Sequence, residues 1–83
     1  MTLDLATIRA MFDAVLAGKV TREEASNWAR ELREAHDRGE LAITPQADWK
    51  RVWQALEFLE GYDLKISPEQ YLHTEEDLIA NKP

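Results

Sequence analysis

Residues 20–39 read Val20-Thr-Arg-Glu-Glu-Ala-Ser-Asn-Trp-Ala-Arg-Glu-Leu-Arg-Glu-Ala-His-Asp-Arg-Gly39 and carry the clearest helix signals in the chain. Thr21 and Glu24 have the spacing of a capping box, in which each side chain accepts a hydrogen bond from a free backbone N–H of the first turn. Apolar residues then recur every three or four positions up to Gly39, a residue type that often follows a helix in the left-handed conformation. We therefore expect a helix that begins after Thr21 and ends before Gly39.

Two more segments repeat this pattern on either side. Residues 4–17 carry an apolar stripe that ends at Gly18, and both Thr2 and Asp4 are suitable caps for its start. Residues 45–60 carry the strongest stripe, with Thr44-Pro45 as N-cap and first helical residue and Gly61 as its end. The residues that we expect in the core from these stripes include Trp28, Leu32, Trp53 and Leu56.

The remaining segments are short. Ser67-Pro68-Glu69 repeats the cap-then-proline pattern and predicts a short helix through Leu72, and Thr74-Glu-Glu-Asp77 predicts another. Residues 40–44 alternate polar and apolar, and we interpret them as an extended link because no second β-type run offers a partner strand.

The predicted fold is all-α, a small antiparallel helical bundle of three principal helices plus one or two short C-terminal helices. With 83 residues the chain is long enough for one domain, spanning residues 1–83. No apolar run has the length of a membrane span, and the first residues do not resemble an export signal. We expect a cytoplasmic protein with no membrane partner.

Residue types that carry chemistry are scarce. The absence of cysteine excludes a disulfide, a thiol nucleophile and a thiolate metal site. His73 and Asp77 could share a helix face as metal ligands, but Thr74 is a suitable cap, and acidic residues in a first turn complement the helix dipole without a metal. His36 has no nucleophile near it in the sequence. We therefore predict a protein that is not an enzyme and that uses no metal or cofactor.

The formal net charge of −6 is concentrated in the last third of the chain, since residues 1–53 carry a net −1 and residues 54–83 a net −5. Thr21-Arg-Glu-Glu-Ala25 resembles the start of many helix-turn-helix motifs, which would make residues 45–60 a recognition helix with only Lys50 and Arg51 to contact DNA. Because an acidic chain repels phosphates, we reject this interpretation and expect no nucleic-acid partner.

The acidic third also contains two tyrosines. Carboxylates beside exposed aromatic rings suit a surface that binds a basic partner, although the same charges also serve solubility. The candidate partner-binding residues are Glu60, Tyr62, Asp63, Tyr71, Glu75, Glu76 and Asp77.

Three stretches, Leu16 to Ala29, Val52 to Leu64 and Tyr71 to Asp77, resemble a group of small bacterial proteins. In size and charge, members of this group are similar to immunity proteins of interbacterial toxin systems. The resemblance implies a non-catalytic protein-binding module, an immunity protein that neutralises a basic toxin. The alternative is a small regulatory or assembly domain that acts through homo-oligomerisation.

Overall fold

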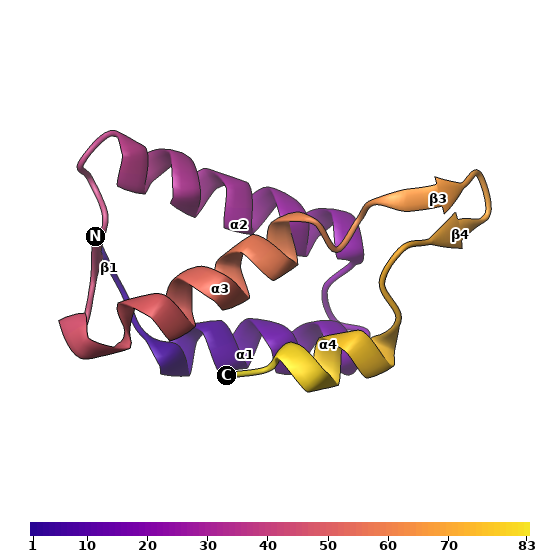
Figure 1. Cartoon of the computed structure of the whole chain (residues 1–83), viewed down its shortest axis with the longest axis horizontal. Helices are drawn as coiled ribbons and strands as arrows, with labels where there is room; N and C mark the ends of the chain where they lie inside the picture. Colours follow the sequence, from indigo (N-terminus) through magenta and orange to yellow (C-terminus); the bar gives the residue numbers. More distant parts are fainter.

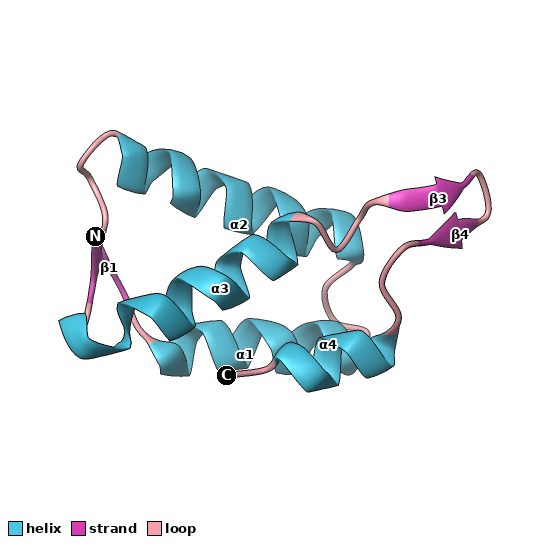
Figure 2. Cartoon of the chain, viewed as in Figure 1, coloured by secondary structure: helices cyan, strands magenta, loops and turns pink.

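The computed structural model describes all 83 residues and is mostly helical (Figures 1 and 2). Its helices are α1 (Leu5–Leu16), α2 (Arg22–Asp37), α3 (Trp49–Glu60) and α4 (Glu75–Asn81), with a 3₁₀ turn, η1 (Gln46–Asp48), directly before α3. Its strand pieces are β1 (Thr2–Leu3), β2 (Ala42–Ile43), β3 (Lys65–Ser67) and β4 (Gln70–Tyr71). A helix-dominated fold is confirmed, whereas the description all-α overlooked two small strand pairs.

The predicted caps of α1 and α2 form. The Thr21 hydroxyl accepts the Glu24 backbone N–H at 3.1 Å, and the Glu24 carboxylate accepts that of Thr21 at 3.2 Å. Asp4, rather than Thr2, caps α1 by accepting the backbone N–H of Thr7 at 2.9 Å. Gly39 follows α2 with a φ of 74°, a conformation that most side chains disfavour. Local sequence therefore sets the ends of α1 and α2.

The link between α2 and α3 has a partner strand, so the prediction of an unpaired extended link is wrong. Thr2 lies opposite Ala42 and Leu3 opposite Ile43 in a two-stranded parallel pair, β1–β2. The partner is a two-residue piece of the N-terminus, too short to show an alternating pattern. This pairing buries Leu3 and its neighbour Leu41 at one end of the core.

The predicted helix after Ser67 is also wrong, because β3 and β4 form an antiparallel hairpin there. Ser67 pairs with Gln70 around Pro68-Glu69. Proline is as suitable for the second position of a β-turn as for the first turn of a helix, and no apolar helical stripe follows it. The prediction for Thr44-Pro45 was wrong in part: these residues precede η1, and α3 begins only at Trp49.

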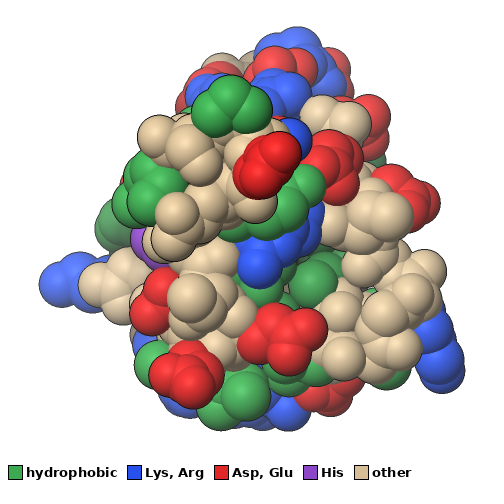
Figure 3. Space-filling model, turned by 90° about the vertical axis from the view of Figure 1, so that its right-hand side faces the viewer, with side chains coloured by type: hydrophobic (Ala, Val, Ile, Leu, Met, Phe, Trp, Pro, Cys, Tyr) green, Lys and Arg blue, Asp and Glu red, His purple; other side chains and the backbone are tan.

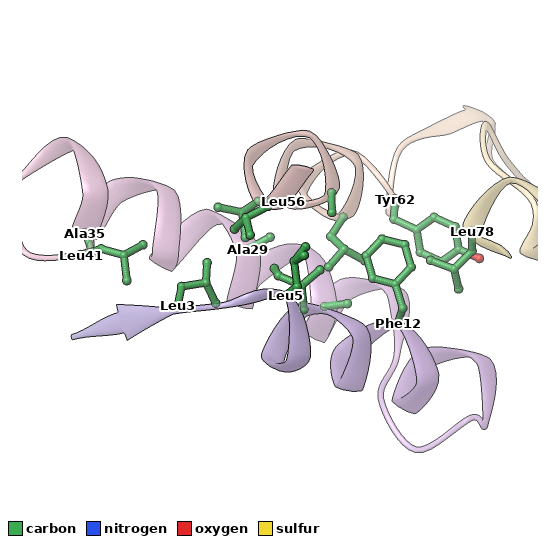
Figure 4. Close-up of a cluster of buried hydrophobic side chains, with 14 residues drawn as sticks. Leu3, Leu5, Phe12, Ala29, Ala35, Leu41, Leu56, Tyr62 and Leu78 are labelled. Atoms are coloured by element: carbon green, nitrogen blue, oxygen red, sulfur yellow. The ribbon is translucent and has the colours of Figure 1, made fainter. Parts of the chain in front are cut away.

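The helices surround one core (Figure 4). In Figure 1, α3 lies between α2 and α1, α4 lies along α1, and the β3–β4 hairpin projects at the end opposite η1. Small buried residues on α2 allow α3 to approach closely, and the buried Ser26 hydroxyl donates to the Glu60 carbonyl oxygen at 2.6 Å. The α2 residues buried in this way are Ala25, Ser26, Ala29 and Ala35.

The tryptophans take more peripheral positions than predicted. Leu56 is buried as expected, but Trp28, Leu32 and Trp53 are half-buried and pack against the core from outside. Alanines take the fully buried positions of the α2 stripe, and Trp28 and Leu32 lie at its edges. None of the helices combines the length and apolar character of a membrane-spanning segment.

Candidate functional site

An exposed set of basic, amide and aromatic side chains lies at the N-terminal end of α3. Helix α3 turns Val52, Ala55, Leu56 and Leu59 toward the core, and its period leaves Lys50, Arg51 and Gln54 exposed to solvent. Trp49 is 47% exposed, an unusual position for an indole ring. We name this set the α3 basic end; its exposed residues are Trp49, Lys50, Arg51 and Gln54.

The two cations of the α3 basic end are unpaired. Neither Lys50 nor Arg51 forms a hydrogen bond or an ion pair within the chain, although Asp48 lies only two or three residues away. Most cations elsewhere are engaged, such as Arg33, which donates to Glu60 at 2.7 Å, and Lys82, which donates to Asp13 at 2.6 Å. Lys19, between α1 and α2, is the other cation without a partner. Lys50 and Arg51 are therefore free to contact an anionic partner.

A cavity of about 570 Å³ adjoins this end, and we name it the Trp49 cavity. The last turns of α2, the β2 segment, η1 and the first residue of α3 form its walls. The His36 ring, on one wall, packs against the Trp53 ring with the centroids 4.8 Å apart and the ring planes tilted by 52°. The lining residues are His36, Leu41, Ala42, Ile43, Thr44, Gln46 and Trp49.

The structure removes Tyr62 from the predicted partner-binding surface. Its side chain is 1% exposed and lies among the core residues near Leu78, and this burial raises the pKa of its hydroxyl (Figure 4). Tyr62 was assigned to a surface because it fits no helical stripe. The chain continues past Gly61 as a turn that brings the ring back over the core, which a stripe does not predict.

Tyr71 is half-buried and is held by groups from other elements. Its hydroxyl donates to the Glu23 carboxylate at 2.7 Å, which raises the pKa of Tyr71 and lowers the pKa of Glu23. The Arg22 guanidinium lies between the rings of Tyr62 and Tyr71, 4.1 Å from each centroid. Arg22 also donates to the carbonyl oxygens of Tyr62 at 3.2 Å and His73 at 2.6 Å.

The predicted acidic residues divide into engaged and exposed groups. Glu60 accepts from Arg33, and this hydrogen bond raises the pKa of Arg33. Asp77 accepts the backbone N–H of Thr74 at 3.0 Å, which lowers the pKa of Asp77. Asp63 is half-buried, whereas Glu75 and Glu76 are exposed in the first turn of α4.

Figure 3 views the molecule from the hairpin end and shows acidic side chains spread among apolar, polar and basic ones. On this face of the molecule, the acidic side chains therefore do not form one continuous patch.

His73 stays outside α4, as predicted, because Thr74 caps the helix. Its Nδ1 lies 3.7 Å from the Asp77 carboxylate. No group of three or more histidine and carboxylate side chains converges anywhere in the structure. The arrangement at His73 is that of a helix start.

Residues 2–81 match the family described as YxzC DNA-binding protein, and the chain belongs to this family. A relative from Bacillus subtilis (strain 168), named uncharacterized protein YxzC, is 45% identical over 65 residues. That match covers 78% of this chain and 48% of the relative, so the chain spans about half the length of the curated relative it matches. No solved structure matches this chain.

Membership of this family corrects three predictions. The resemblance to immunity proteins of toxin systems is wrong, because the matching family is a different one. The predicted role as a protein-binding antidote conflicts with the description of the family as DNA-binding, and so does the exclusion of a nucleic-acid partner. The alternative role through homo-oligomerisation gains no support from these findings.

The α3 basic end was visible in the sequence and was given too little weight. Lys50 and Arg51 were identified, but they were judged against the net charge of the whole chain. A better signal is local: Lys50 has no carboxylate three or four residues away, so no helical ion pair can neutralise it.

Proposed function

We propose that this chain binds DNA through the α3 basic end. The observation that carries the proposal is the match of residues 2–81 to a family described as DNA-binding. Lys50 and Arg51 would contact phosphates, because cations that replace condensed counterions supply most of the affinity of such contacts. Gln54 follows on the same exposed face and would contribute hydrogen bonds.

The overall acidity of the chain is compatible with this proposal. The molecule is 37 Å long, and the hairpin projects at the end opposite η1 and the start of α3 (Figure 1). At physiological salt, electrostatic interactions between exposed charges are screened beyond about 8 Å. A phosphate at Lys50 would therefore sense the nearby cations far more strongly than Glu75 or Glu76.

The proposal does not use a helix-turn-helix motif. Helix α2 ends at Asp37 and α3 begins at Trp49, whereas the turn of that motif has only about 3–4 residues. The intervening residues instead form β2 and η1, which separate the end of α2 from the start of α3 (Figure 1).

Three finer predictions form part of the proposal. The helices would form the antiparallel bundle that short connections favour. The protein would act in the cytoplasm, where a bacterial chromosome is accessible. It would bind DNA without catalysing a reaction on it.

The test compares two double variants that remove the same charge. Lys50→Ala/Arg51→Ala should weaken DNA binding and lower the slope of log affinity against log salt by about 2, one for each lost phosphate contact. Lys19→Ala/Arg30→Ala is the matched control, because Lys19 lies between α1 and α2 and Arg30 lies beside Glu57 in the second half of α3. Fluorescence anisotropy of labelled DNA at several salt concentrations measures both.

If the two double variants lose the same affinity, binding does not depend on the α3 basic end. If the unmodified protein binds neither single-stranded nor duplex DNA, the proposed function is wrong.

A further inference from the structure

We propose that the DNA bound by this chain presents an unpaired base, which stacks on Trp49 and enters the Trp49 cavity. The inference rests on the proposed function and specifies its ligand as single-stranded or locally opened DNA. It arises from one juxtaposition: the half-exposed Trp49 ring lines a cavity, and the two residues that follow it in the chain are unpaired cations.

The cavity has the chemistry that a nucleobase requires. Its volume of about 570 Å³ falls within the range of small-molecule sites, roughly 300–1,000 Å³. Leu41, Ile43 and the Trp49 ring offer apolar surface to the flat faces of a base. Thr44 and Gln46 offer a hydroxyl and an amide to its polar edge, and neither side chain has a hydrogen-bond partner within the chain.

The two cations favour a nucleotide, which carries phosphates, over an uncharged ligand. Lys50 and Arg51 follow Trp49 directly in the chain, so their side chains start within one helical turn of the cavity rim. A base inserted beside Trp49 carries a phosphate on each side, and these phosphates would lie within reach of the two cations. Aromatic platforms beside basic side chains are the common means of binding single strands.

Duplex DNA fits this arrangement poorly. Stacking hides the faces of its bases, and pairing occupies their edges, so a duplex must open before a base can reach Trp49. The unpaired cations alone would bind duplex and single strands through phosphates. Preference for the single strand is therefore the property that depends on the Trp49 cavity.

The experiment measures the affinity of the full chain for a single-stranded oligothymidylate and for the duplex that it forms with its complement, at one low salt concentration. We expect the single strand to bind more tightly. Trp49→Ala should weaken single-strand binding by about tenfold or more. It should also reduce the difference in affinity between the single strand and the duplex. Trp49→Phe should retain most of the affinity, because a phenyl ring still stacks.

Ile66→Ala is the matched control, since Ile66 is 60% exposed on the hairpin at the opposite end of the molecule. It should leave both affinities unchanged. Thermal melts of all three variants show whether they remain folded. Should Trp49→Ala fail to fold, Trp49→Phe tests the stacking instead. Its tryptophan fluorescence, from Trp28 and Trp53 alone, should no longer be quenched when DNA binds, whereas the unmodified protein should be quenched.

Two results would overturn the inference and leave the proposed function intact: equal or tighter binding to duplex, or a Trp49→Ala variant that binds the single strand as well as the unmodified protein does. Binding to neither form would overturn both proposals.

Discussion

Arg22 connects parts of the chain that are distant in sequence. It is the first residue of α2, yet its guanidinium donates to carbonyl oxygens that follow α3 and precede α4, and it separates the rings of Tyr62 and Tyr71. A planar guanidinium can stack on two rings while it donates in its own plane, which an ammonium cannot do. One side chain thus attaches the hairpin to the helices.

We expect Arg22→Ala to lower the free energy of unfolding by about 2–3 kcal/mol, because two charged hydrogen bonds and two cation–π contacts are lost. Arg22→Lys should restore little of the lost free energy of unfolding. Urea unfolding followed by circular dichroism measures the change. Arg30→Ala, on the same helix with one exposed hydrogen bond to Asn27, is the control and should stay within about 0.5 kcal/mol. Equal losses for Arg22→Ala and Arg30→Ala would show that the stacked arrangement contributes nothing.

At the scale of elements, α4 is the helix that depends most on its ends. It has seven residues and buries only Leu78. The capping box of Thr74 and Asp77 stabilises its start. After its end, the Lys82 ammonium forms an ion pair with the Asp13 carboxylate of α1. A helix this short is not stable by itself in water, so these end contacts decide whether it forms.

We expect Thr74→Ala to lower the free energy of unfolding by about 1 kcal/mol, the usual effect of removing an N-cap side chain. Glu75→Gln/Glu76→Gln should cause a smaller loss, since both side chains are exposed, accept no hydrogen bond from the chain and act only through the helix dipole. Thermal unfolding of the two variants tests this difference. A larger loss for the glutamine variant would mean that charge, rather than the cap, holds α4.

Over the whole molecule, carboxylates engaged in hydrogen bonds couple folding to pH. Backbone N–H donation from Thr7 lowers the pKa of Asp4, and donation from Thr74 lowers that of Asp77. The Tyr71 hydroxyl lowers the pKa of Glu23 in the same way. These three groups lie at the starts of α1, α4 and α2, so acid weakens three of the four helices together.

Since each of these pKa values is lower in the folded than in the unfolded state, their stabilisation is complete above the ordinary values of 3.8 and 4.5 and is lost as the pH falls through the folded values. We expect a melting temperature that is steady from neutral pH to about pH 5 and then declines. Asp4→Asn should show a shallower decline. An unchanged melting temperature down to about pH 3 would contradict this account.

Local sequence patterns were enough to place α1 and α2, most of α3, and the starts of α2 and α4. These features depend on residues within four positions of each other, such as Thr21 with Glu24 and Thr74 with Asp77, so local hydrogen bonds are enough to specify them. The apolar stripe also identified Leu56 as buried.

The remaining features depend on residues far apart in the chain, which no local pattern relates. β2 is a strand because Thr2 and Leu3 lie beside it, and Tyr62 is buried because the chain turns back over the core after Gly61. The candidate site follows the same rule. Arg33 pairs with Glu60, 27 positions away, whereas Arg51 pairs with no carboxylate although Asp48 lies three positions before it, and spacing along the sequence predicts neither outcome.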